Sequence, residues 1–187
     1  HRSMRVVFEQ SWKLLNEAEQ HAFRKLCIFQ GDFDRKAARQ VANTSVINLS
    51  SLMNKSFIHR GEKERYYIHD RLKDFGRQKL AAIPKEEKES RRRHAVYFMA
   101  LLEQKSQTRR DKQVLTKIAR EIKNIRLAWQ WAVEQADIAS FSASLDGLFY
   151  FYQTRSLFEE GLNSFSDAAQ STEDDRDDDS RWHDKLV

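Results

Sequence analysis

Apolar residues recur at helical spacing through most of this chain. Phe33, Ala37 and Val41 stand at positions i, i+4 and i+8, which predicts a short helix that ends near Asn43. Beyond Pro84, apolar stripes at alternating steps of three and four residues predict four further helices, joined by short connections at 135–137 and 154–156 that favour antiparallel neighbours. The four stripes are Ala95, Phe98, Met99 and Leu102; Leu115, Ile118, Ile122, Ile125 and Trp129; Ile138, Phe141, Leu145, Leu148 and Tyr152; and Phe158, Leu162, Phe165 and Ala169.

Two helical segments lie at the start of the chain and meet at Asn16. Asn16 is the expected N-cap of the second segment, with Glu19 as the carboxylate of a capping box. Gly31 is expected to end that helix. Thr44 or Ser45 is expected to cap a later helix. The apolar residues assigned to the first segment are Val7, Trp12, Leu14 and Leu15, and those assigned to the inward face of the later helix are Val46, Leu49, Leu52 and Met53.

The period of the pattern changes between residues 57 and 69. Two short β-prone runs, 57–60 and 65–69, flank a polar turn that contains Gly61, which predicts a β-hairpin. Asp70 is the expected N-cap of a closing helix, and Leu72, Phe75 and Leu80 share one face of that helix. A helix-turn-helix that is followed at once by a hairpin has the element order of a winged helix.

These elements predict a mainly α chain of two domains and a tail. We expect a winged-helix domain, made of helices plus one β-hairpin, at 1–84 and antiparallel helical hairpins of tetratricopeptide-like type at 85–171. The acidic segment 172–187 is expected to be a flexible tail. Five glycines and one proline in 187 residues agree with a mainly α chain, because strand-rich folds use both residues in their turns.

Charge and cysteine content narrow the classes of partner and compartment. The net charge is +5, but residues 1–170 hold 30 Lys and Arg against 21 Asp and Glu, a net charge of +9. This basicity favours an anionic partner, whether a nucleotide, a nucleic acid or an acidic protein surface, without choosing among them. No stretch approaches the roughly 18 apolar residues of a membrane span, so we expect no membrane partner. The single cysteine, Cys27, fits a reducing cytosol, and the expected localisation is cytoplasmic.

No catalytic or metal-binding motif stands out in the chain. It lacks a phosphate-binding P-loop, a dinucleotide-binding glycine motif, a zinc-protease motif and a nucleophile elbow. The six histidines, at 1, 21, 59, 69, 94 and 183, are scattered, and no two stand at helical ligand spacing together with a carboxylate. We therefore expect no catalytic residue, no metal site and no enzyme activity of the chain on its own.

A winged helix raises the alternative of a DNA-binding transcription regulator with a helical dimerisation domain. Asn48, Ser51, Asn54 and Lys55 are the residues that could face DNA, and Lys55 is the only charged residue among them. The other basic residues lie elsewhere, among them the run 91–93, which stands beside three glutamates and is expected to be a solvated face. DNA is therefore the weaker candidate partner.

The tripeptide Ile68-His69-Asp70 stands where the second strand of the hairpin passes into the closing helix. In this position it resembles the Met-His-Asp motif of the STAND signalling ATPases of NB-ARC type. Residues 8–15 and 23–33 resemble that family's segments at the start of its winged helix. Residues 121–129 resemble the helix that opens the tetratricopeptide-like region in bacterial members, such as LuxR-type or related transcriptional regulators.

The resemblance implies a regulatory, non-catalytic fragment. It implies that His69 approaches the phosphates of bound ADP and that Asp70 caps the helix beside it. ADP or ATP would then be the cofactor of the parent protein and not of this fragment, which alone would bind ADP weakly or not at all. The implied partners are the nucleotide-binding domain of the parent and a protein or small-ligand signal on the helical repeats. A plain scaffold, in which both halves only bind proteins, is a third interpretation that gives His69 no role.

Overall fold

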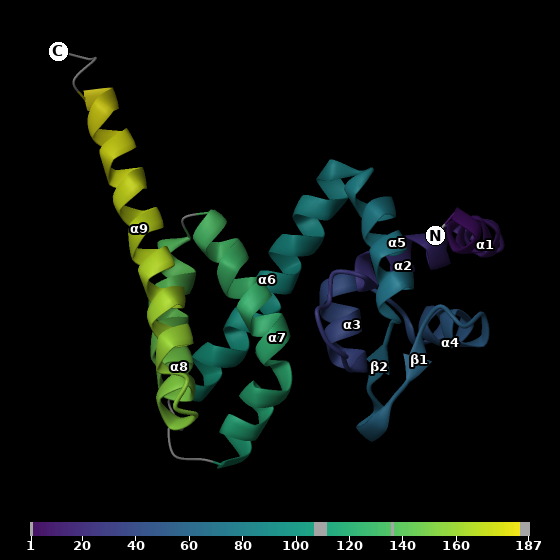
Figure 1. The fold of residues 1–187 in the computed structure, drawn as a ribbon, viewed down its shortest axis with the longest axis horizontal. Helices are drawn as coiled ribbons and strands as arrows, with labels where there is room; N and C mark the ends of the chain where they lie inside the picture. The colour runs from purple at the N-terminus through teal and green to yellow at the C-terminus, as the bar shows by residue number, and fades with distance from the viewer. Residues whose placement is uncertain (1, 107–111, 136, 184–187) are drawn as a thin grey trace. The chain divides into compact units, whose positions relative to one another are not determined.

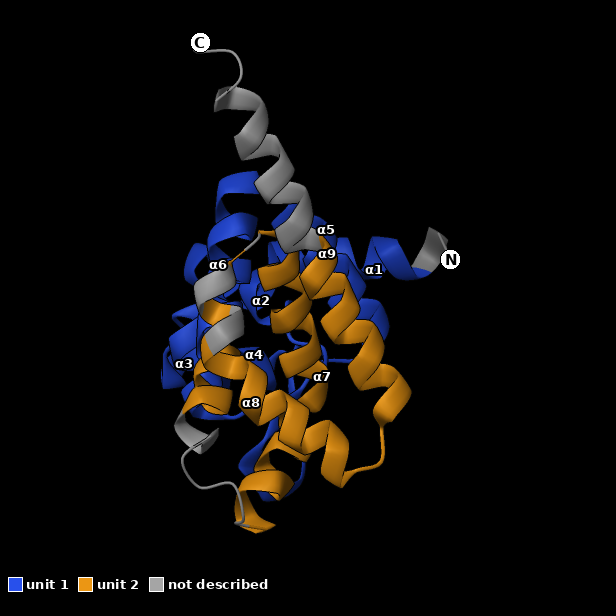
Figure 2. Ribbon diagram, turned by 90° about the vertical axis from the view of Figure 1, so that its left-hand side faces the viewer, with its two compact units in different colours: residues 1–97 blue, residues 98–187 orange. Residues whose placement is uncertain are grey.

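The computed structural model describes residues 2–106, 112–135 and 137–183 and shows a mainly α chain with one β-hairpin (Figure 1). Side chains are described within these ranges except at 2–3, 104–106, 138–139, 141–142 and 171–183. The prediction of a mainly α fold is confirmed. The chain divides into two compact units, residues 1–97 and 98–187 (Figure 2), and each is described by itself.

Unit 1 contains the elements that the sequence predicts for a winged helix. Four helices come first, then a hairpin with a short 3-10 turn, a closing helix and the first part of a long helix. In order, they are α1 (Arg2–Lys13), α2 (Glu17–Leu26), α3 (Arg35–Ala42), α4 (Val46–Asn54), β1 (His59–Arg60), the 3-10 turn (Glu62–Glu64), β2 (Tyr66–Tyr67), α5 (Asp70–Ala81) and α6 (Pro84–Ser106).

The helix boundaries of unit 1 follow from their capping residues. Asn16 and Glu19 form the predicted capping box at the start of α2. Ser45, rather than Thr44, caps α4 through its hydroxyl. Asn43 ends α3 in the left-handed conformation, with a φ of 52°. These three boundaries lie where the sequence places them.

Helix α2 ends earlier than predicted. Leu26 is its last residue, and Gly31 lies beyond it. The backbone N–H groups of Ile28 and Phe29 donate to carbonyls three residues back, which tightens the chain into a turn directly after the helix. This turn buries Cys27, Ile28 and Phe29. The packing of these residues in the hydrophobic core therefore ends the helix upstream of Gly31.

The core of unit 1 is built around aromatic rings. Phe29 stacks on Phe33 with ring centroids 4.5 Å apart, and Phe23 meets Phe57 edge-on at 4.9 Å. The predicted inward residues of α3 and α5 are buried, which confirms both faces. Part of the inward face predicted for α4 is wrong, because Val46 is 49% exposed. Val7 on α1, Leu14 directly after that helix and Ile47 on α4 are exposed as well.

The boundary between the units differs from the predicted one at residue 84. The first part of α6 packs on unit 1: Arg24 donates to Glu86 at 2.8 Å, Arg93 donates to the carbonyl of Gln40 at 2.6 Å, and the ring of His94 lies 5.7 Å from that of Phe29. Because of these contacts, the division falls inside α6, between Tyr97 and Phe98.

Unit 2 consists of the rest of α6 followed by α7 (Lys112–Glu134), α8 (Ile138–Thr154) and α9 (Phe158–His183), of which the last three pack on one another. The stripe on α6 is fully buried, as predicted. On α9, Phe158 and Leu162 are 64% and 68% exposed, so they do not form the predicted inward face. Small residues take that place: a Cβ at Gly161 would lie 3.2 Å from the Cβ of Tyr152, which is how closely α9 approaches α8.

Some predicted features of unit 2 fall at the limits of the described residues. The side chains of Ile138 and Phe141 lie outside them, while Leu145, in the same predicted stripe, is 43% exposed. Helix α9 extends to His183, into the acidic segment 172–187 that the sequence predicts to be flexible. The side chains of that segment lie outside the described residues as well.

The two units carry charges of opposite sign. Residues 1–97 hold 21 Lys and Arg against 12 Asp and Glu, a net charge of +9. Residues 98–187 hold 12 against 16, a net charge of −4. The basic surplus of the chain therefore belongs to unit 1, and the negative charge of unit 2 comes from residues 171–187, which hold seven acids against three bases.

Candidate functional site

The candidate site is the junction at which β2 passes into α5. Ile68 is buried, 3% exposed, and anchors the junction in the core. His69 is exposed and adopts an extended conformation, and its carbonyl accepts the backbone N–H groups of Leu72 and Lys73. His69, not Asp70, is therefore the N-cap residue of α5, and its side chain makes no capping hydrogen bond.

The predicted capping role of Asp70 is wrong. Asp70 is the first residue inside the helix, and its side chain is 98% exposed. Its carboxylate lies 3.9 Å from Nζ of Lys73, one helical turn further on. Asp70 therefore adds a negative charge at the helix start, where it interacts favourably with the helix dipole but does not fix the backbone of His69.

A second histidine, which the sequence analysis did not assign, stands beside His69. His59 on β1 pairs in register with Tyr67 on β2. The ring centroids of His59 and His69 are 4.6 Å apart, and Tyr67 lies 5.3 Å from His59 and 5.4 Å from His69. Tyr67 and His69 are two residues apart, so they share a face, and the strand pairing places His59 on the same face.

The surroundings of His59 favour its neutral imidazole. Burial of the His59 ring, and then the neighbouring His69, lower the pKa of His59 below its usual value of 6.5. Each imidazole can donate an N–H to an oxyanion, and the first backbone N–H groups of a helix have no partner inside the helix. The histidine pair, defined as His59 and His69, therefore stands where a phosphate oxygen could be held.

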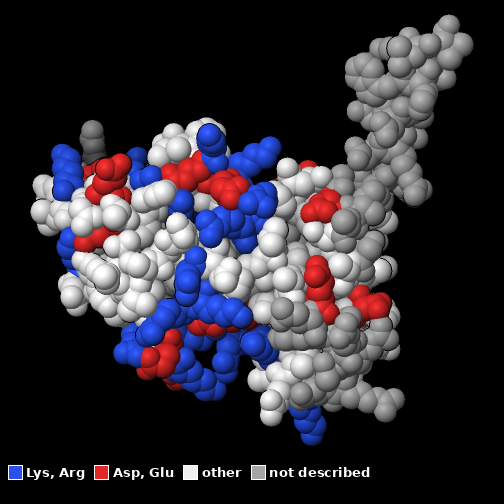
Figure 3. Space-filling view, turned by 180° about the vertical axis from the view of Figure 1, so that it is seen from behind, with Lys and Arg blue, Asp and Glu red and all other residues white. Residues whose placement is uncertain are grey.

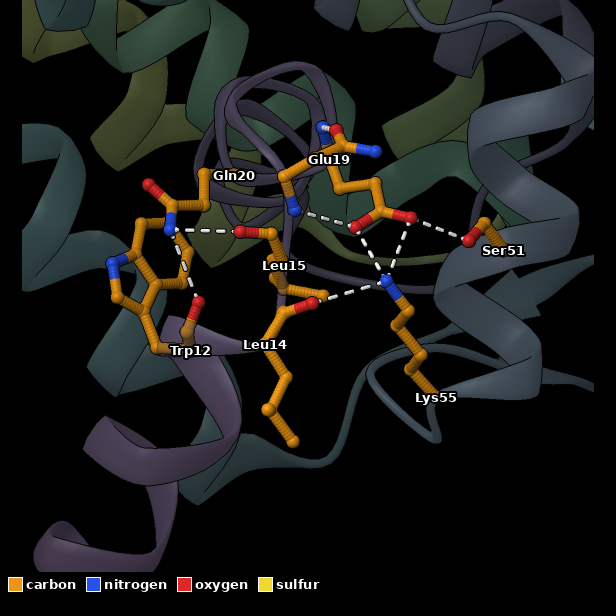
Figure 4. A network of polar contacts seen from close by, with 8 residues as sticks. Trp12, Leu14, Leu15, Glu19, Gln20, Ser51 and Lys55 are labelled. Carbon is orange, nitrogen blue, oxygen red and sulfur yellow. Dashed lines mark hydrogen bonds and ion pairs between the residues drawn. The ribbon is translucent and has the colours of Figure 1, made fainter.

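The residues of the DNA-facing alternative are arranged differently from the prediction. Ser51 and Lys55 point to Glu19 (Figure 4): the Ser51 hydroxyl lies 2.5 Å from one carboxylate oxygen, and Lys55 Nζ lies 2.7 Å from the other. Asn48 is half-buried, and Asn54 is exposed. Of the four candidates, two are therefore engaged in contacts that hold α4 against α2.

Glu19 is the centre of this network. Burial alone would raise the pKa of its carboxyl, but hydrogen bonds from Lys55, Ser51 and the backbone of Asn16 outweigh that effect and lower the pKa. Lys55 also donates to the carbonyl of Leu14. The charged groups of this network are paired within the chain, so the network stabilises the packing of α4 against α2.

The arginine run of α6 is also engaged within unit 1. Arg91 pairs with Glu87, and Arg92 pairs with Glu89, each at 2.9 Å. Arg93 donates to the carbonyl of Gln40, so none of the three side chains is left without a partner. Figure 3 shows basic and acidic side chains intermixed on one face of the molecule. These contacts agree with the expectation that the run is a solvated face.

Among residues 2–106, 112–135 and 137–183, no three His, Cys, Asp or Glu side chains come together as a metal site. Within the same ranges, no helix combines the length and the apolar character needed to cross a membrane.

Comparisons with known proteins give a small set of similar chains. Curated proteins of Mycobacterium tuberculosis and Mycobacterium bovis, each named "Putative HTH-type transcriptional regulator", are 29% identical over 177 residues. The match covers 88% of this chain, which spans only 20% of the length of those relatives. A solved structure of a signal-transduction ATPase with numerous domains and a tetratricopeptide repeat sensor, from Pyrococcus horikoshii, is 19% identical. Its TM-score is 0.45, with 88% of this chain and 27% of that chain covered. No family model matches the chain.

Proposed function

We propose that this chain is a non-catalytic regulatory part of a larger STAND-type ATPase or related transcriptional regulator. In this proposal, unit 1 contacts the phosphates of bound ADP through His69. The helical hairpins of unit 2 bind a signal, which is a protein or a small ligand. Because the chain has no P-loop motif, the proposal assigns the nucleotide-binding domain to another part of the parent protein.

The observation that carries the proposal is the position of His69. Its exposed imidazole stands at the N-terminus of α5, a 12-residue helix, with the imidazole of His59 beside it. A helix N-terminus favours anions, and an imidazole N–H forms a charge-assisted hydrogen bond with an anionic phosphate oxygen. The net charge of +9 on unit 1 acts in the same direction. The name of the mycobacterial relatives agrees with a role in regulation.

The DNA-binding alternative has less support from these contacts. Ser51 and Lys55, two of its four candidate residues, are held by Glu19. The exposed side of α4 also carries Ile47, which is 79% exposed and offers no hydrogen bond to a base edge.

A titration of the isolated chain with ADP, followed by NMR, tests the phosphate contact. We expect weak binding, with a dissociation constant on the order of millimolar, because one or two imidazole contacts replace a whole nucleotide site. The imidazole signals of His59 and His69 and the first backbone amides of α5 should shift. Binding should tighten as the pH falls below the ordinary imidazole value of 6.5, because the lowered pKa of His59 places its protonation, and its change to a charged donor, below that value.

Two variants serve as the comparison in this titration. His69→Ala should remove the shifts, whereas His21→Ala, whose imidazole pairs with Glu86 elsewhere in unit 1, should leave them unchanged. ADP affinity that survives His69→Ala would show that His69 is not the contact. Shifts confined to α4 in the presence of duplex DNA, with none from ADP, would favour the DNA-binding alternative instead.

A further inference from the structure

Unit 2 contains a pocket between α7, α8 and α9. Its volume is about 260 Å³, slightly below the range of pockets that bind drug-sized ligands, so it suits a single side chain or a small organic ion. Helix α7 contributes an aromatic, an apolar and a basic residue, α8 an aromatic residue, and α9 two acids. In that order they are Trp129, Val133, Arg126, Tyr152, Glu160 and Asp167.

The aromatic walls of the pocket are held in place by their polar ends and by packing. The indole N–H of Trp129 donates to the carbonyl of Ser164 at 3.1 Å, and the hydroxyl of Tyr152 lies 3.2 Å from Glu160. Both rings meet Phe165 edge-on, at centroid distances of 5.7 and 6.1 Å. Trp129 and Tyr152 are 4% and 3% exposed, so the pocket is formed before any ligand arrives.

The charges that line the pocket leave a surplus of one acid. Arg126 donates to Glu160 at 2.7 Å, so these two charges offset each other. Asp167 is exposed and forms no ion pair with any side chain in the described part of the chain. Burial raises the pKa of Tyr152, so its phenol stays neutral and does not change this balance. The remaining charge in the pocket is therefore the carboxylate of Asp167.

We propose that this pocket binds an alkylguanidinium or alkylammonium group, the cationic end of a basic side chain or of a small amine. Asp167 pairs with the charged group, and the apolar stem lies along Val133 and the aromatic walls. The inference rests on the proposed function in one respect, because it names the chemistry of the signal that unit 2 receives.

The test follows the indole N–H signal of Trp129 by NMR while three probes are added to the full chain. The probes are N-acetyl-arginine methylamide, its neutral analogue N-acetyl-citrulline methylamide, and agmatine, which is a free amine. We expect the arginine probe to bind with a dissociation constant on the order of millimolar. The citrulline probe should bind at least about threefold more weakly, because it keeps the shape and loses the charge.

Two variants test whether Asp167 supplies the negative charge that binds the probe. Asp167→Asn should weaken the arginine probe by about threefold to tenfold, whereas Glu159→Gln, an exposed acid of α9 that does not line the pocket, should leave it unchanged. Tighter binding of the arginine probe than of agmatine assigns the pocket to a polypeptide side chain, and the reverse order assigns it to a free amine. Both orders support the proposal.

Equal binding of the arginine and citrulline probes would overturn the proposal, as would an unchanged affinity in Asp167→Asn or no shift of Trp129 with any probe. His69→Ala should not affect this titration. If no probe binds the pocket while ADP binds through His69, the proposed ligand chemistry of the pocket is wrong and the proposed nucleotide contact is retained. If the ADP titration fails while the pocket binds the cation, the nucleotide contact is wrong and the ligand chemistry stands.

Discussion

Replacing Gly76 by alanine is expected to destabilise unit 1 by about 3 kcal/mol. Gly76 lies in α5, and a Cβ at this position would stand 2.2 Å from Sγ of Cys27 and 2.8 Å from a ring carbon of Phe23. Both neighbours are fully buried, so neither can move aside without disturbing the core. Alanine favours a helix over glycine by about 1 kcal/mol, which offsets only part of this cost.

Urea denaturation of the chain measures this effect. Gly61→Ala is the matched control: its nearest neighbour would lie at an ordinary 3.4 Å and its φ is −99°, so we expect little change. Adding Cys27→Ala to Gly76→Ala should restore part of the lost stability, because the Sγ atom makes the closest contact. A Gly76→Ala variant as stable as the unmodified chain would mean that α5 and α2 do not approach this closely.

Replacing Glu19 by alanine is expected to cost about 2–3 kcal/mol. The side chain is buried, and its removal breaks the capping box of α2 and leaves Lys55 and Ser51 without their carboxylate partner. Because Lys55 is partly exposed, water takes over some of its contacts, and the cost stays below that of a fully buried pair.

The same denaturation measurement tests Glu19 across pH. Glu17→Ala, an exposed change in the first turn of the same helix, should cost much less. The lowered pKa of Glu19 means that its contribution is present above the ordinary value of 4.5 and is lost as the pH falls through the folded-state pKa. The stabilities of the two proteins should therefore converge in acid. A Glu19→Ala variant within about 0.5 kcal/mol of the unmodified chain at pH 7 would contradict the structural role of this network.

Local signals in the sequence predicted the elements of unit 1 well. A capping box needs only residues three apart, so Asn16 and Glu19 could be paired from the sequence. The partners Ser51 and Lys55 stand 32 and 36 residues from Glu19, and no local pattern indicates them. Their assignment to a DNA-facing surface relied on polarity alone, which does not distinguish a solvated side chain from one that holds two helices together.

The candidate site was predicted in part. The position of His69 at the hairpin–helix junction follows from the change of period. The second imidazole, His59, depends on strand register, which a hairpin with a six-residue separation between Arg60 and Tyr66 does not fix from the sequence alone. The N-cap of α5 was predicted one residue too late, at Asp70 instead of His69. Helix boundaries depend on which carbonyl accepts the first hydrogen bond.

In unit 2, periodicity predicted the helices but not all of their buried faces. Phe158 and Leu162 follow helical spacing, yet both are exposed, because α9 approaches α8 closely at Gly161. On α9, the large apolar residues and the small residues beside them both recur at helical spacing. Packing distance, which periodicity does not contain, decides between them.

The central claim is that His69 holds bound ADP, and the rate of ADP release from the parent protein tests it most directly. The measurement uses the proposed parent protein, in which this chain would occur together with a nucleotide-binding domain. His69→Ala is predicted to release ADP at least about tenfold faster, which is the loss of one charge-assisted hydrogen bond, while His21→Ala releases it at the unmodified rate. Release from His69→Ala at the unmodified rate would contradict the account.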